Sequence, residues 1–142
     1  HSSMTNNPIV YLSRRITFAS AHRLHVHTFD EQKNREMFEK CNNTHGHNYT
    51  LTVTLKGTPD AETGMLINLD DLNKLLITHV KNDFDHKHID DEVEEFKTMP
   101  STAENIAVVI WNRLRKVIPN GLLYEVHLQE TENNTAIYRG ES

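Results

Sequence analysis

Two segments of the chain alternate apolar and polar residues with the period of two that is typical of a half-buried β-strand. In residues 9–22, one parity holds Val10, Leu12, Ile16, Phe18, Ser20 and His22. In residues 45–57, one parity holds His45, His47, Tyr49, Leu51, Val53 and Leu55, and three threonines lie on the other. The pattern predicts two strands, each with one face toward the core.

Two later segments carry apolar residues at helical spacing. In residues 68–80 these are Leu69, Leu72, Leu75, Leu76 and Val80, and Asn68 is placed to cap the helix. A second helix is expected to begin at the capping-box sequence of residues 101–104 and to continue to Ile118, before Pro-Asn-Gly at residues 119–121. The connection of residues 27–43 has weak periodicity, and residues 82–99 are acidic and irregular in pattern. We expect residues 27–43 to form a long connection with one helical turn.

The chain closes with two more predicted strands, residues 122–130 and 135–140, joined by a turn at residues 132–134. The order is then β-β-α-α-β-β. It indicates an α+β domain with an antiparallel four-stranded sheet and two helices on one face. Because an open sheet leaves unpaired backbone groups along its edges, we expect the sheet to continue across subunits in an oligomer.

The composition excludes several classes of protein. At 142 residues and 16.5 kDa, the chain has the size of one domain. No apolar run approaches the roughly 20 residues needed to span a bilayer. The net charge of −5, without a stripe of Lys and Arg, argues against a nucleic-acid partner. We therefore expect neither a membrane nor a nucleic acid as partner.

The first four residues, His-Ser-Ser-Met, are typical of the remnant of a tag, so we expect residues 1–4 to be a tag remnant and residues 5–142 to form a single domain. We also expect no secretory signal. The chain has one cysteine, Cys41, which cannot form an intrachain disulfide. This fits a reducing compartment, and we expect the cytoplasm.

Three histidines are predicted to converge on one metal ion. His45 and His47 are separated by one residue on a predicted strand, so both side chains leave the same face. His22 ends the inward parity of the preceding strand, and an antiparallel pairing would bring it beside them. Imidazole ligands favour zinc, and three of them leave a fourth position open, as in catalytic sites. His25 and His27 form a competing pair in a polar segment.

Cys41 lies four residues before His45 and leaves three interpretations open. It could be a fourth metal ligand, which would close the site. It could also be a base or nucleophile beside the metal, because cations and imidazoles nearby favour the thiolate. The third interpretation is an inert buried thiol.

Two acidic positions suggest further chemistry. Asp85 precedes His86, and a carboxylate beside an imidazole can orient it and stabilise its charged form during proton transfer. Glu130 continues the inward parity of its strand, so its carboxylate needs a partner. That partner could be the planar N–H edge of a pterin or guanine, which pairs with a carboxylate through two hydrogen bonds. Alternatively, the strand ends at Gln129 and Glu130 is solvated.

These segments together resemble one known family. The sequences ITFASAHRL, CNNTHGHNY, GMLINLDDL, DFDHKHID, STAENIAVVIW and ETENNTAIYRGE occur in this order and span most of the chain from Val10 to Glu141. In this order they are similar to 6-pyruvoyl tetrahydropterin synthases. The combination of C-x-x-x-H-G-H with the late E-T-x-N-N is the most specific part of the resemblance.

The resemblance implies a tunnelling fold, in which sheets of neighbouring subunits join into a barrel, and a homohexamer formed by two trimers with active sites between subunits. It implies a lyase reaction, in which 7,8-dihydroneopterin triphosphate loses triphosphate and rearranges to 6-pyruvoyl tetrahydropterin for tetrahydrobiopterin biosynthesis. The substrate would thus be a small pterin triphosphate, and the cofactor Zn²⁺.

The same resemblance assigns roles to individual residues. It implies that His22, His45 and His47 bind zinc and that Cys41 is the proton-abstracting base. Asp85 and His86 match a proton relay, and Glu130 and Thr102 match positions that contact the pterin.

Two alternatives remain, together with one open question about the substrate. The 6-carboxy-tetrahydropterin synthases of the queuosine pathway share the C-x-x-x-H-G-H element and the substrate. A non-catalytic module that binds zinc or a pterin is the other alternative. For the triphosphate, Arg14, Arg15 and Arg23 are the candidate ligands.

Overall fold

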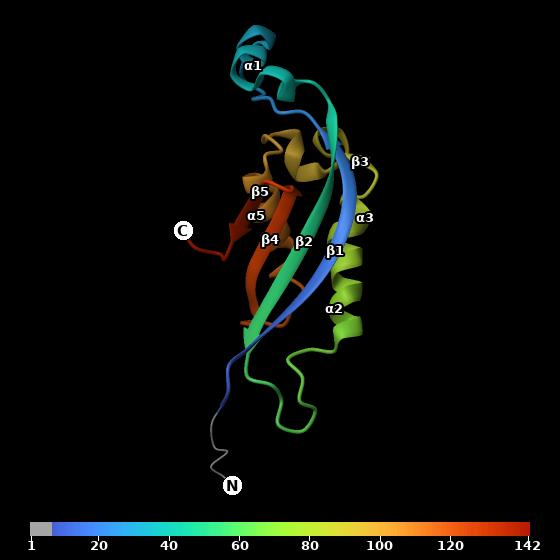
Figure 1. Cartoon of the computed structure of the whole chain (residues 1–142), viewed down its shortest axis with the longest axis vertical. Coiled ribbons are helices and arrows are strands. Elements are labelled where there is room, and N and C mark those ends of the chain that lie inside the picture. Colours follow the sequence, from blue (N-terminus) through green and yellow to red (C-terminus); the bar gives the residue numbers. More distant parts are fainter. Residues whose placement is uncertain (1–6) are drawn as a thin grey trace.

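A computed structural model describes residues 7–142 of the chain (Figure 1). The expected tag remnant, residues 1–4, lies outside the described residues. Within the described part the sheet has five strands in the order β3-β1-β2-β4-β5. They are β1 (Val10–His22), β2 (His45–Gly57), β3 (Lys87–His88), β4 (Leu123–Thr131) and β5 (Asn134–Tyr138). The α+β class and the four long antiparallel strands agree with the prediction.

The fifth strand corrects the expected four-stranded sheet. β3 has two residues and pairs in parallel with Ser20 and Ala21 of β1. It lies in the acidic segment that has no alternating pattern. A strand this short has no periodicity to detect, and its position depends on the neighbouring strand rather than on its own sequence.

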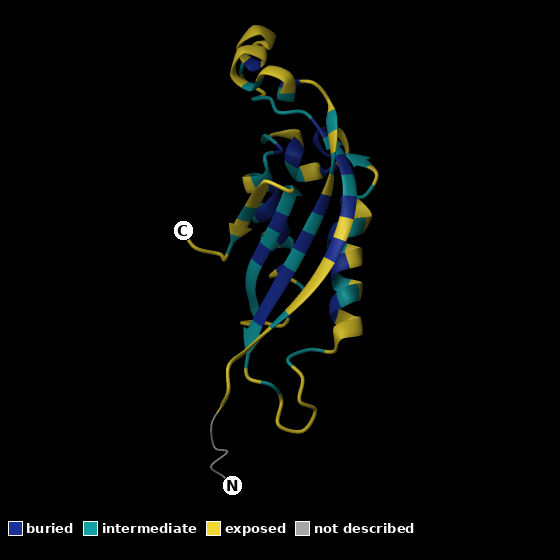
Figure 2. Cartoon of the chain, viewed as in Figure 1, coloured by how far each residue is buried: buried dark blue, intermediate teal, exposed yellow. Residues whose placement is uncertain are grey.

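β1 and β2 form the long axis of the molecule (Figure 1). They pair without interruption from Val10 and Gly57 at one end to His22 and His45 at the other. The inward parity of β2 is buried from Tyr49 to Leu55, as predicted. On β1 the second half of this parity is buried from Ile16 on, whereas in its first half Leu12 is only partly buried and its neighbours on that parity are exposed (Figure 2). The predicted alternation is therefore right, but the core covers only part of β1.

The first predicted helix forms, and it is longer than the pattern indicated. α2 (Leu69–Leu76) is capped by Asn68, whose side chain accepts from the backbone N–H of Asp70 at 2.8 Å. It continues through a π-helical segment, Ile77–Lys81, into α3 (Asn82–Phe84). The helical segment buries Leu72, Leu76, Val80 and Phe84 against the sheet.

The second predicted helix differs at both ends. α5 (Ala103–Leu114) is capped by Thr102, which accepts from the N–H of Asn105, whereas the capping-box pattern had placed Ser101 at the cap. The helix ends at Leu114, and Ile118 lies in the turn that follows. The backbone N–H of Ile118 donates to the carbonyl oxygen of Leu114 at 2.8 Å. Its buried face joins that of α2 in one core on one face of the sheet.

Short elements fill the segments that had been expected to be irregular. α1 (Glu31–Phe38) and a 3-10 turn (Glu39–Asn42) occupy the connection between β1 and β2, and α1 lies at one end of the long β1–β2 pair (Figure 1). α4 (Ile89–Glu92) and a second 3-10 turn (Glu94–Lys97) follow β3. Among residues 7–142, no helix has the length and apolar character needed to cross a membrane.

Candidate functional site

The end of the β1–β2 pair brings three histidines together. His22 and His45 are direct partners across the two strands, and His47 lies opposite Ser20. One nitrogen atom of each ring lies within 4.8 Å of one nitrogen atom of each of the others. The convergence predicted from strand parity is thus confirmed as geometry, and these three side chains could hold a metal ion.

Hydrogen bonds orient two of the three rings. Nδ1 of His22 lies 2.8 Å from the carbonyl oxygen of Ser101, and Nδ1 of His45 lies 2.7 Å from that of Asn43. Because a carbonyl only accepts, each Nδ1 carries the proton and Nε2 keeps its lone pair. Nε2 of His22 is buried and has no hydrogen-bond partner in the described residues. This is the arrangement of histidines that bind a metal through Nε2, so the residues fit such an ion.

Burial favours the neutral imidazole at two of the three histidines, His22 and His47. His22 is 1% exposed, and burial lowers its pKa to about 4, although the bond to Ser101 opposes the shift. The pKa of His47 is also lowered, mainly by burial, while Glu130 opposes the shift. Only the neutral imidazole binds a metal, so the site is prepared for an ion at neutral pH.

A cavity of about 480 Å³ opens beside the three histidines. It is also lined by Leu24, Lys40, Cys41, Glu130, Thr131 and Asn134. Cys41 is a free, half-buried cysteine. Its backbone carbonyl accepts from the N–H of Leu24 at 2.8 Å, which fixes the 3-10 turn against the end of β1. Cys41 and the three histidines therefore line the same cavity.

Glu130 faces inward, so the interpretation of a solvated strand end is wrong. Its Oε2 lies 3.8 Å from Nε2 of His22 and 3.9 Å from Nε2 of His47. β4 continues to Thr131, and the pairing with β5 is irregular between Gln129 and Thr131. Such an irregularity redirects a side chain at the end of a strand.

A second cavity, of about 520 Å³, shares Glu130 with the first. It includes Thr102, at the start of α5, and Ala136 of β5. Leu24 and Asn134 also line both cavities. The two cavities thus meet at the Glu130 carboxylate, with the histidines on one side and the α5 N-terminus on the other.

Comparison with known proteins identifies the family. The sequence model of the 6-pyruvoyl tetrahydropterin synthases matches residues 11–141. The chain belongs to this family. It is 46% identical over 132 residues to the human 6-pyruvoyl tetrahydrobiopterin synthase, covering 92% of this chain and 91% of that protein. It is 44% identical over 140 residues to the Drosophila melanogaster enzyme, covering 96% and 83%.

The fold agrees with the sequence comparison. The structure of the Caenorhabditis elegans 6-pyruvoyl tetrahydropterin synthase superposes with a TM-score of 0.89 at 41% identity, over 94% of this chain and 97% of that one. The tunnelling-fold subunit inferred from the sequence resemblance is therefore confirmed.

The chain places the pair formed by Asp85 and His86 apart from the cavity that Cys41 lines. Nδ1 of His86 lies 3.0 Å from Oδ2 of Asp85, and Oδ1 of Asp85 accepts from the N–H of Ala19 at 2.9 Å. That hydrogen bond is the main reason why the pKa of Asp85 is lowered. His86 lines a cavity beside β3 that does not include Cys41, and its side chain is 83% exposed. Asp85 and His86 are therefore paired as predicted, but within a single chain this pair does not share a cavity with Cys41.

Sequence reasoning missed two buried residues that support the histidine cluster. Ser101 is fully buried and donates to Oδ1 of Asp90 at 2.7 Å, and Oδ2 of Asp90 accepts from the N–H of Arg23 at 2.8 Å. This network fixes the Ser101 carbonyl that orients His22. Asp90 lies in an acidic run and gave no signal of its own. Ser101 had been interpreted only as a helix cap.

The remaining candidates lie outside the cluster. His25 and His27 meet edge to face with ring centroids 4.4 Å apart, but no third metal-binding side chain joins them within the described residues. Arg14 and Arg15 line a separate cavity with Lys81.

Proposed function

We propose that this chain is a zinc-dependent lyase that converts 7,8-dihydroneopterin triphosphate to 6-pyruvoyl tetrahydropterin and triphosphate, in tetrahydrobiopterin biosynthesis. The observation that carries the proposal is the shared cavity, whose lining brings together three histidines, the free Cys41 and the inward Glu130. Family membership and the names of the relatives support the same reaction.

His22, His45 and His47 would hold the zinc ion. When bound, zinc acts as a Lewis acid that polarises substrate oxygens and acidifies the adjacent C–H bonds. The chain's contribution is to hold one nitrogen atom of each ring near one point and to keep the Nε2 lone pairs of His22 and His45 free. The Ser101 and Asn43 carbonyls do this for His22 and His45.

Glu130 and Thr102 would bind the pterin. The Glu130 carboxylate lies where the two cavities meet, so a ring held there has its side chain next to the histidines. A carboxylate can accept two parallel N–H bonds from the 2-amino and ring N–H groups of a pterin. Thr102 lines the second cavity beside this position.

Cys41 would act as the base that removes a proton from the substrate side chain. It lines the same cavity as the three histidines, so its thiol is near the carbons that the metal would activate. Asp85 and His86 would then form the relay for proton return. Since His86 lines another cavity in this chain and Asp85 pairs with it, we assign both to the site of a neighbouring subunit.

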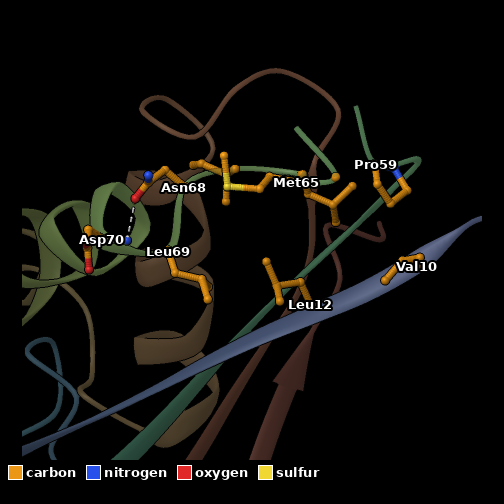
Figure 3. A pocket seen from close by; sticks show the side chains of 10 residues that line it. Val10, Leu12, Pro59, Met65, Asn68, Leu69 and Asp70 are labelled. Carbon is orange, nitrogen blue, oxygen red and sulfur yellow. Dashed lines mark hydrogen bonds between the residues drawn. The ribbon is translucent and has the colours of Figure 1, made fainter. Parts of the chain in front are cut away.

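A homohexamer formed by two trimers, with sheets joined into barrels, would create such shared sites. Two features of the single chain support it. β1 pairs with β3 only at Ser20 and Ala21, so most of its outer edge has no partner in the described residues. A largely apolar cavity of about 380 Å³ lies beside the start of this edge, and Leu12, Met65 and Leu69 are among the residues that line it (Figure 3). Exposed edges and apolar surfaces of this kind mark interfaces.

We further propose that residues 5–142 act as one pterin-synthase domain in the cytoplasm. One core unites both helices with the sheet, and the family model covers residues 11–141. The single cysteine, Cys41, must stay reduced to act as a base, which a reducing compartment ensures.

Identification of the product tests this proposal. Purified protein would be incubated with dihydroneopterin triphosphate and zinc, and the pterins separated and identified by mass. We expect 6-pyruvoyl tetrahydropterin together with triphosphate. The 6-carboxy product and acetaldehyde would instead indicate the queuosine-pathway reaction, which the names of the relatives do not favour. Bound but unaltered substrate would indicate a non-catalytic pterin-binding module.

A further inference from the structure

The charges around the two joined cavities are unevenly distributed. Among the described residues that line them, the acidic side chains are Glu130 and Glu104. Lys40 is the one Lys or Arg in this lining, and it lies on the histidine side. It belongs to the 3-10 turn that also carries Cys41. The space is thus acidic toward α5 and cationic beside the thiol.

The cation of Lys40 is free to meet a ligand. The described residues place no carboxylate within 4.0 Å of its Nζ, whereas Lys97 pairs with Glu94 at 3.1 Å. Lys33, on the adjacent helix α1, lies over the ring of Phe29 at 3.9 Å. An ammonium group at the wall of a cavity, without an anionic partner, attracts an anion into that cavity.

The arginines suggested by the sequence do not line this cavity. Arg14 is eight residues before His22 on β1, a separation along the strand of up to about 26 Å at roughly 3.3 Å per residue. Arg15 lies with it in another cavity, beside α2. Arg23 follows His22 directly, and neighbouring residues of an extended chain point to opposite sides. Within one chain, Lys40 is therefore the cation best placed for the phosphate end of the substrate.

We propose that Lys40 binds the triphosphate of the substrate and thereby determines the direction in which the substrate lies in the cavity. The inference rests on the proposed function. The pterin donates N–H bonds and suits the Glu130 side, while the phosphates carry negative charge and suit the Lys40 side. The reverse orientation would bring triphosphate against Glu130 and Glu104, and like charges at close range are costly. In the favoured orientation, the three-carbon side chain of the substrate lies between the Glu130 side and the Lys40 side, next to the histidines and Cys41.

Binding of inorganic triphosphate to the purified zinc protein tests this assignment by calorimetry, without turnover. We expect Lys40→Gln to weaken this binding about tenfold, as loss of a charge-assisted hydrogen bond does. Lys40→Arg should keep most of the affinity. Lys33→Gln, which removes the same charge from the neighbouring helix, should bind as the wild type does. Added salt should weaken wild-type binding more than that of Lys40→Gln.

Neopterin without phosphates provides the second probe. Lys40→Gln should bind it as tightly as the wild type, because its pterin end interacts with Glu130. In steady-state kinetics with the full substrate, the same variant should raise KM more than it lowers kcat.

Several results would overturn the assignment. It is wrong if wild-type protein does not bind triphosphate, if Lys40→Gln binds it unchanged, or if Lys33→Gln loses as much affinity. Equal losses for neopterin and triphosphate would show that Lys40 supports the cavity rather than the phosphates. If Lys40→Gln changed the pH profile of the reaction but bound triphosphate as the wild type does, Lys40 would act on the ionisation of Cys41 rather than on the phosphates. The proposed function fails separately, if wild-type protein neither binds neopterin nor forms the pyruvoyl product.

Discussion

His22 and Ser101 are 79 positions apart in the sequence, and Nδ1 of His22 lies 2.8 Å from the Ser101 carbonyl oxygen. The bond joins the end of β1 to the residue before the Thr102 cap of α5. It fixes the tautomer of the buried histidine and directs Nε2 toward His45 and His47. The start of a helix thereby orients a candidate metal ligand.

The buried His22 should make the stability of the metal-free protein depend on pH. Its pKa is about 4 in the folded state against 6.5 in the unfolded chain, so the unfolded chain takes up the proton first. The free energy of unfolding should fall as pH decreases from about 6.5, by up to about 3 kcal/mol near pH 4. Urea unfolding at several pH values measures this.

His22→Asn should remove most of that pH dependence, whereas His27→Asn, at an exposed position, should retain it. The comparison concerns the change with pH rather than the absolute stability. Parallel curves for wild type and His22→Asn would show that other groups cause the dependence.

Cys41→Ala should separate catalysis from metal binding. If Cys41 is the base, the variant should keep its far-UV circular dichroism and about one zinc per chain, yet release triphosphate at least 100-fold more slowly. Metal analysis and a triphosphate assay measure the two properties. Zinc lost together with activity would instead identify Cys41 as a fourth ligand, and normal turnover would leave it without a catalytic role.

Mixed oligomers should show whether two subunits share one site. Cys41→Ala and His86→Ala proteins should each be inactive alone. After unfolding and refolding as an equal mixture, some sites combine an intact Cys41 with an intact neighbouring His86, and about a quarter of the wild-type activity should return. Each variant refolded alone is the control. If both residues act within one chain, the mixture stays inactive.

Two glycines provide a matched test of packing near the C-terminus. Gly64 and Gly140 have φ of 73° and 75°, so alanine is strained at either position. A Cβ at Gly140 would also lie 2.5 Å from Cζ2 of Trp111, while nothing lies within 4 Å at Gly64. We expect Gly64→Ala to cost about 1 kcal/mol and Gly140→Ala about 1 to 3 kcal/mol more.

Urea unfolding gives both free energies, and the fluorescence of Trp111, the sole tryptophan, should change only in Gly140→Ala. Equal costs would mean that the indole moves aside without loss of packing.

Much of the site could be predicted because strand geometry is local. Side chains alternate along a strand, so the spacing of His45 and His47 already places them on one face. The parity of β1 then adds His22, and the parity of β4 turns Glu130 inward. The structure confirms all four positions.

Errors arose where contacts distant in sequence decide the structure. The two residues of β3 have no pattern of their own and are held by β1. Ser101 follows the capping-box spacing, but its hydroxyl bonds to Asp90, and Thr102 caps the helix instead.

Periodicity and residue type are properties of short segments, so the sequence was enough to predict the four longer strands, the two main helices and most of the residues of the candidate site. The grouping of these residues depends on the tertiary structure. It joined His22 to Ser101, put Lys40 rather than the arginines in the wall of the site, and left His86 in a different cavity from Cys41. Such groupings depend on how distant segments pack, which no local pattern encodes.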